Sequence, residues 1–133
     1  MSSADAWDIY WSGAHARGAL QSEQPQNDVL DQFWRVQLEK HGMSGDGRIL
    51  EVACGRGSVL AHARAFRSRV GLDYSTAALG ELRKNDADAQ LVAADAARAP
   101  FDAGSFDVVA TQYGLEYAGR EAFEPALRLV AAG

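Results

Sequence analysis

Acidic side chains recur at a fixed interval in the middle of the chain. Glu51, Asp73 and Asp95 are each 22 residues apart, and each lies within or just after a short apolar run. In an open α/β sheet, ligands bind at the edge formed by the carboxyl ends of the strands. Asp73 follows Gly57 by 16 residues, where a carboxylate can accept hydrogen bonds from both hydroxyls of a ribose. The spacing predicts a binding site at that edge.

A glycine turn follows the first acid. The apolar run Ile49–Val52 leads directly into Ala53-Cys54-Gly55-Arg56-Gly57. Residues without bulk let the backbone approach a ligand closely, and the N–H groups at the start of a following helix are unpaired donors. Many α/β proteins also have a glycine here only to pack a helix against a strand. The acids in register with the turn are therefore what favours a binding site.

Alternating strands and helices must position these residues. Apolar runs of strand length alternate with helical patterns from residue 48 onward, and Ser75 suits a helix N-cap. This order predicts βαβ units, a parallel sheet and right-handed crossovers. Residues 1–47 form a separate N-terminal helical segment, with a second helix capped by Asn27 or Asp28 and ended by Gly42. The predicted strands cover 48–53, 69–73, 90–94 and 106–111, and the helices between and after them cover 58–66, 75–84 and 120–131.

Composition limits the class of protein. The chain has 133 residues, enough for one core, and 13 basic against 18 acidic residues, a net charge of −5 that argues against a nucleic-acid partner. We interpret the one basic cluster, Arg64, Arg67 and Arg69, as a solvated helix end. The N-terminus has no signal-peptide pattern, no apolar run approaches the ~20 residues of a membrane span, and the single cysteine allows no internal disulfide. We expect a cytoplasmic protein with no membrane partner.

Four segments together resemble the class I S-adenosylmethionine-dependent methyltransferases. The resemblance covers about residues 48–133 and is closest to the large small-molecule group that includes the quinone-biosynthesis enzymes. Its most specific element is the stretch Ala94–Val109, which contains Pro100-Phe101 and Ser105-Phe106-Asp107. The segments are 49–57 (the glycine motif), 70–75 (the second strand), 94–109 and 128–133.

This resemblance implies an α/β fold, a Rossmann-like three-layer sandwich with a parallel sheet of order 3-2-1-4, which lacks the last strands of the full methyltransferase fold. It also implies S-adenosylmethionine as the cofactor. Glu51 and the Gly55–Gly57 backbone would face its methionine portion, and Asp73 its ribose. The remaining expected contacts are Tyr74 and Asp95 with adenine, a backbone contact from Ala96, and Gln112 and Tyr113 near the methyl group.

The sequence departs from the family pattern at two places. Ala53 stands where the family usually has its first glycine, and it belongs to the predicted cofactor-binding set as a small residue of the turn. Glu116 and Tyr117 occupy a position where many relatives have histidine, so the acceptor chemistry there is open. No catalytic residue is assigned, because methyl transfer from a sulfonium needs positioning and exclusion of water more than covalent catalysis.

The sequence leaves two possible functions open. The first is a methyltransferase, or its cofactor-binding portion, with a small-molecule acceptor. The second is a catalytically silent binding or assembly domain, because the strand at 106–111 would be an open apolar edge that further chain or a homodimer partner must cover.

Other sites are disfavoured. A nicotinamide site lacks its third glycine, where Leu60 stands, and Cys54 is better explained as a small buried thiol than as a nucleophile. The histidines His15, His41 and His62 do not have the spacing of metal ligands, and His15 is interpreted as a solvated loop residue. Trp7, Tyr10 and Trp11 could either cover the cofactor as a lid or pack on the core.

Overall fold

A four-stranded parallel sheet forms the centre of the molecule. The computed structural model describes residues 3–12, 25–41, 46–114 and 118–131. The strands are β1 (Arg48–Val52), β2 (Ser68–Asp73), β3 (Gln90–Ala93) and β4 (Val108–Ala110), in the order β3-β2-β1-β4. All three pairings are parallel, with Leu50 opposite both Val70 and Val109. The predicted strand order is confirmed.

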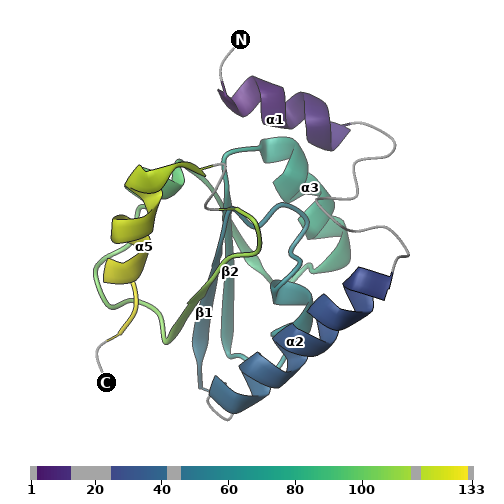
Figure 1. Cartoon of the computed structure of the whole chain (residues 1–133). Helices are drawn as coiled ribbons and strands as arrows, with labels where there is room; N and C mark the ends of the chain where they lie inside the picture. Colours follow the sequence, from purple (N-terminus) through teal and green to yellow (C-terminus); the bar gives the residue numbers. More distant parts are fainter. Residues whose placement is uncertain (1–2, 13–24, 42–45, 115–117, 132–133) are drawn as a thin grey trace.

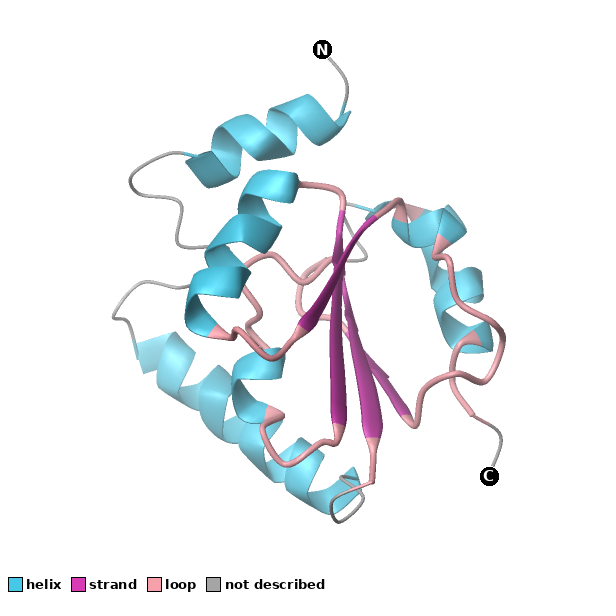
Figure 2. Ribbon diagram, turned by 180° about the vertical axis from the view of Figure 1, so that it is seen from behind, coloured by secondary structure: helices cyan, strands magenta, loops and turns pink. Residues whose placement is uncertain are grey.

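Helices cover both faces of the sheet, so the predicted three-layer arrangement is also confirmed (Figure 1; Figure 2). On one side lie α2 (Pro25–His41), the 3₁₀ turn η1 (Leu60–His62) and α3 (Thr76–Asn85). On the other side lie α5 (Phe123–Arg128) and the 3₁₀ turns η2 (Ala96–Arg98) and η3 (Arg120–Ala122). The N-terminal helix α1 (Ser3–Ser12) packs on α3. None of the described helices is long and apolar enough to span a membrane.

Two apolar cores lie on opposite faces of the sheet because side chains alternate along each strand. Ile49 of β1 packs with Leu60 and Leu82 in the core beneath α2 and α3. Its neighbours Leu50 and Val52 belong to the other core, beneath α5, with partners that include Val70, Leu72, Phe106 and Leu129. The sheet edge that carries the carboxyl ends of the strands is therefore held rigidly from both sides.

Three expectations about the helices are wrong. Residues 58–66 form only η1, because the N–H groups of His62, Ala63 and Phe66 donate to carbonyls three residues back and the chain continues in tight bends instead of an α-helix. The final helix ends at Arg128, because Phe106 exchanges backbone hydrogen bonds with Leu129 and Ala131 and extends the chain there. Helix α2 begins at Pro25, so Asn27 and Asp28 lie in its first turn and are not its N-cap.

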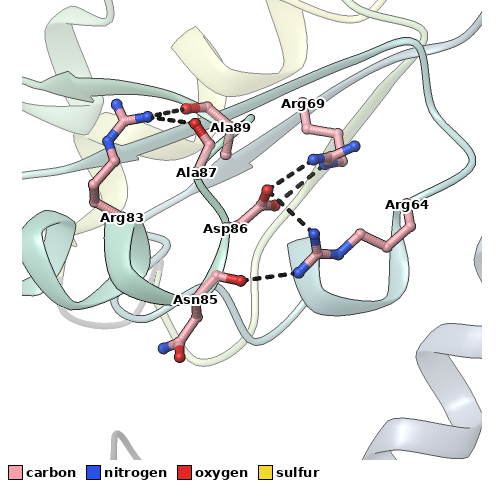
Figure 3. Close-up of polar contacts among 7 residues, drawn as sticks. All are labelled: Arg64, Arg69, Arg83, Asn85, Asp86, Ala87 and Ala89. Carbon is pink, nitrogen blue, oxygen red and sulfur yellow. Dashed lines mark hydrogen bonds and ion pairs between the residues drawn. The ribbon is translucent and has the colours of Figure 1, made fainter.

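The arginine cluster is only partly solvated, because Arg64 and Arg67 are exposed but Arg69 is nearly buried. Asp86, only 3% exposed, accepts hydrogen bonds from Arg69 at 2.8 and 3.3 Å and from Arg64 at 3.3 Å (Figure 3). Arg83 donates to the carbonyls of Ala87 and Ala89 in the same turn. Burial alone would raise the pKa of Asp86, but the hydrogen bonds and charges of the arginines lower it below its ordinary value. This network fixes the α3–β3 turn against the start of β2.

Candidate functional site

A cavity of about 570 Å³ opens at the carboxyl ends of the strands. This volume is within the usual range for a small-molecule site. The predicted residues Ala53, Gly55, Asp73, Tyr74, Asp95, Ala96 and Gln112 all line it, whereas Glu51 and Gly57 do not. The other lining residues are Trp7, Tyr10, Cys54, Ser58, Leu72, Ala94, Tyr113, Gly114 and Ala118.

Asp73 is the buried acid at the centre of the cavity wall. Its Oδ2 accepts from the Gly55 backbone N–H at 2.8 Å and its Oδ1 from that of Ser75 at 2.9 Å. Burial raises the pKa of Asp73 above its ordinary value; these hydrogen bonds oppose the shift, and the nearby charge of Asp8 adds to it. The acid thus joins β2 to the glycine turn, and it also accepts a backbone hydrogen bond from Tyr74.

Glu51 stabilises the segment after the glycine turn through hydrogen bonds to its backbone. Its carboxylate is fully buried and accepts from the N–H groups of Val59 at 3.2 Å and Leu60 at 3.0 Å. Burial raises the pKa of Glu51 to about 8, although the two hydrogen bonds work against this shift and the charge of Asp73 adds to it. Glu51 therefore lies behind the cavity wall, and its predicted contact with the cofactor stays a prediction.

Gly57 likewise serves packing. A Cβ on Gly57 would lie 2.5 Å from Cδ1 of Leu82, and its φ of +86° is unfavourable for any side chain. The glycine lets the turn rest directly on α3. This is the helix–strand packing role that the sequence left open beside the ligand-binding one.

The cavity wall contains two strained residues. Ala53 and Tyr113, at φ 51° and 57°, are the described non-glycine residues with positive φ, and both line the cavity. Ala53 packs directly on Gly114, the residue after Tyr113, because a Cβ on Gly114 would lie 2.5 Å from the Cβ of Ala53. Such strain persists where the surrounding structure enforces it, often at functional sites. The close packing here joins the turn after β1 to the segment after β4.

The far end of the cavity is formed after β3. Asp95 accepts from the N–H of Ala97 at 2.9 Å and so caps η2 through one oxygen. Tyr74 is 45% exposed and also lines the cavity. Cys54 is a buried free thiol, as expected, and its pKa is raised well above the ordinary value by burial and by the charges of Glu51 and Asp73. A thiol held in its neutral form is not a nucleophile.

Helix α1 covers the cavity. Trp7 and Tyr10 line it, and their rings meet edge to face at 5.7 Å. Asp8, between them, accepts from the Ser75 hydroxyl and from the Ala77 N–H at 3.2 Å, while Ser75 caps α3 as predicted. These contacts favour the lid interpretation of Trp7 and Tyr10; the Trp11 side chain, His15, Glu116 and Tyr117 lie outside the described residues.

Trp34 is a residue that sequence reasoning missed. Its indole Nε1 donates to Oε1 of Gln112, 78 residues further along the chain. The sequence shows Trp34 only as an apolar position of a helix, and no local pattern indicates a partner so distant. Among the described residues no group of three or more potential metal ligands gathers.

The donor set fits an adenosyl cofactor. Two carboxylates, a partly exposed tyrosine ring and a close-packed glycine turn line one cavity, and its described lining has no basic side chain that would favour a phosphate. A methyltransferase-domain family model matches residues 49–132 of this chain. The fold is that of the S-adenosylmethionine-dependent methyltransferases, and S-adenosylmethionine is the cofactor. The chain belongs to this family.

Curated relatives include quinone-biosynthesis enzymes. The demethylmenaquinone methyltransferase of Beutenbergia cavernae is 38% identical over 95 residues, which cover 67% of this chain and 40% of that protein. The ubiquinone/menaquinone biosynthesis C-methyltransferase UbiE of Citrifermentans bemidjiense is 31% identical over 122 residues, 77% of this chain and 52% of that protein. The chain thus spans about half the length of these relatives.

Solved structures share the fold. The phosphoethanolamine N-methyltransferase 1 of Haemonchus contortus, in complex with phosphoethanolamine and S-adenosylhomocysteine, superposes with a TM-score of 0.70 at 18% identity. The superposition covers 96% of this chain and 29% of that chain. At this identity the similarity concerns the fold alone.

Proposed function

We propose that the protein binds S-adenosylmethionine in the cavity at the carboxyl ends of the strands and transfers its methyl group to a small-molecule acceptor in the cytoplasm. The observation that carries the proposal is the convergence of Asp73, Asp95 and the glycine turn on a single cavity of about 570 Å³. The family membership supports the cofactor, and the quinone-biosynthesis relatives support a small acceptor.

Three residues of the cavity have a proposed task in binding the cofactor. Asp73 accepts from the ribose hydroxyls, Asp95 accepts from the adenine amino group, and Tyr74 packs on the ring. When bound, the cofactor supplies an electrophilic methyl group on a sulfonium. The protein's part is to hold the reactants in line and to exclude water, for which α1 is well placed.

Binding is tested with S-adenosylhomocysteine. At 100 times Kd the ligand should stabilise the chain by ~2.7 kcal/mol, seen as a higher Tm. Asp73→Ala should remove most of this shift, while the exposed Glu39→Ala should keep it. No shift in the wild type, or an equal shift in Asp73→Ala, would overturn the proposal. Radiolabelled methyl transfer from S-adenosylmethionine to a panel of phenols and quinols then tests catalysis.

A second candidate function is a cofactor-binding assembly domain without turnover. The observation that favours it is an apolar surface at β4, which pairs with β1 on one side only in the described sheet. A second cavity of about 890 Å³ lies here, lined by Phe33, Val108, Phe123 and Leu127 among others. We propose that a second copy of the chain covers this surface. Binding of S-adenosylhomocysteine together with dimerisation and no methyl transfer to the panel would favour this candidate.

A further inference from the structure

The cavity has a direction that follows from the strand order. Asp95 lies after β3, Asp73 at the end of β2, the glycine turn after β1, and Gln112 after β4, so they follow one another along the edge β3-β2-β1-β4. If the adenine lies at Asp95 and the ribose at Asp73, as proposed above, the rest of the ligand extends across the glycine turn toward Gln112. That remaining part is the methionine portion, with its ammonium and carboxylate groups.

The carboxylate of this portion requires donors, and the described lining offers no charged one. No lysine, arginine or histidine lines the cavity in the described parts of the chain. The side-chain donors there are neutral, and they are the hydroxyls of Tyr10, Ser58, Tyr74 and Tyr113, the Trp7 indole and the Gln112 amide. Gln112 stands at the end of the cavity where the strand order places the methionine portion.

The orientation of the Gln112 amide is set by Trp34. An indole N–H can only donate, so the oxygen of the amide must face Trp34 and the NH₂ group must face away. Among the described residues this NH₂ group has no hydrogen-bond partner, yet it is not among the buried unpaired atoms. Gln112 lines the cavity, and the NH₂ group is the part of its amide that faces away from Trp34.

Trp34 is itself held firmly. It is partly buried against the core that contains Leu38 and Ile49, and its ring meets that of Phe33 edge to face at 5.2 Å. The indole therefore works as a fixed point on α2 that prevents the Gln112 amide from turning over.

We infer that Trp34 is a positioning residue, which fixes Gln112 so that its NH₂ group binds the carboxylate of the cofactor's methionine portion. The inference rests on the proposed function, and it makes the N-terminal segment part of cofactor recognition.

The test compares two ligands that share the adenosine part and the sulfur. S-adenosylhomocysteine carries the amino-acid group, and 5′-methylthioadenosine lacks it, so the ratio of their Kd values reports on that group alone. By calorimetry, Trp34→Phe and Gln112→Ala should each weaken S-adenosylhomocysteine binding by about tenfold, the effect of losing a hydrogen bond to a charged group. Both should leave the Kd of 5′-methylthioadenosine within about twofold.

Gln112→Glu sharpens the test, because its carboxylate can still accept from Trp34 but has no donor for the ligand. It should weaken S-adenosylhomocysteine further than Gln112→Ala and again spare 5′-methylthioadenosine. Val36→Ala is the matched control, since it shortens an exposed apolar side chain of α2 and leaves the Trp34–Gln112 hydrogen bond and the Phe33 ring in place, and it should change neither Kd. Thermal unfolding without ligand verifies that each variant is folded.

The outcomes separate the inference from the proposed function. If Trp34→Phe or Gln112→Ala weakens both ligands equally, or neither, the inference is overturned and the proposed function stands. If the wild type binds neither ligand, the proposed function fails and the inference fails with it.

Discussion

Ala53 carries a backbone conformation that suits glycine better than alanine. Its φ of 51° lies in the left-handed region, which costs an L-residue roughly 1 kcal/mol. Gly80 is the reverse case, because it is an exposed helical glycine with no atom within 4 Å of an added Cβ. The two positions together distinguish backbone strain from a general effect of glycine content.

Ala53→Gly should therefore raise the free energy of unfolding by up to about 1 kcal/mol, and Gly80→Ala should raise it by a similar ~1 kcal/mol. Chemical denaturation of both variants and of the double variant measures this. If Ala53→Gly destabilises the chain, the left-handed conformation is not strained in the way described.

The buried Glu51 gives stability a dependence on pH. Its pKa is raised to about 8 by burial, from an ordinary 4.5, so the folded chain holds the proton more tightly than the unfolded chain. The stabilisation is complete below about pH 4.5 and is lost as the pH rises through 8. We expect the Tm of the wild type to fall between pH 5 and 8.

Glu51→Gln should lose most of that slope, at the cost of one of the two hydrogen bonds to the turn. The slope that remains belongs to Asp73, whose pKa burial also raises. Thermal unfolding at several pH values measures the Tm of the wild type and of Glu51→Gln. Parallel curves would show that Glu51 does not titrate in this range.

At the scale of elements, α1 is attached to α3 through Asp8. This carboxylate accepts from the Ser75 hydroxyl and the Ala77 N–H at the start of α3, and Trp7 and Tyr10 beside it form the cover of the cavity. A cap of this type contributes roughly 1 kcal/mol.

Asp8→Ala should lower the free energy of unfolding by roughly 1 kcal/mol and weaken S-adenosylhomocysteine binding, since the cover loses its attachment. Glu39→Ala, an exposed acid of α2, should change neither quantity. Chemical denaturation measures the free energy of unfolding, and calorimetry on the same samples measures the Kd of S-adenosylhomocysteine. Unchanged ligand affinity in Asp8→Ala would show that α1 does not act as a lid.

The sequence was informative where structure is local. The placement of Asp73 and Asp95 on the cavity could be predicted because acids at the carboxyl ends of parallel strands meet at one sheet edge, whereas the strand order was implied by the family resemblance. The contacts of Asp8 with α3 and of Trp34 with Gln112 could not, because each joins residues about 70 apart without a local pattern. The helix expected at 58–66 is replaced by tight bends with hydrogen bonds three residues back, which the Ala-rich composition does not reveal.

Over the whole molecule, the two ends of the sheet have separate tasks. The carboxyl end carries the cavity, and the Asp86–arginine network lies at the start of β2 (Figure 3). Arg69 is nearly buried there, with 11% of its side chain exposed, so the loss of Asp86 would leave an unpaired buried charge.

Asp86→Ala should therefore cost roughly 3–5 kcal/mol of stability and leave the affinity for S-adenosylhomocysteine unchanged while the chain is folded. Arg64→Ala, whose side chain is 55% exposed, should cost under about 1 kcal/mol. Denaturation curves and calorimetry at low temperature provide the two readings. A loss of affinity in Asp86→Ala would contradict this expectation and show that the network at the start of β2 affects ligand binding at the carboxyl end of the sheet.

The apolar surface at β4 predicts self-association of the 133-residue chain. Phe123 and Leu127 are 55% and 57% exposed beside it. Leu127→Glu should convert a dimer to a monomer in light scattering, whereas Glu39→Lys on α2 should not. A monomeric wild type would contradict the proposed dimer.

The position of β1 inside the sheet sets an order of events during synthesis. Its first partner, β2, leaves the ribosome soon after it, but its second partner begins only at Val108. At about 5–20 residues per second, a nascent chain spends several seconds with one side of β1 unpaired. An open apolar strand edge is a template for intermolecular pairing. We therefore expect released chains truncated between Ala94 and Val108, which lack β4, to aggregate or to recruit chaperones far more than the 133-residue protein.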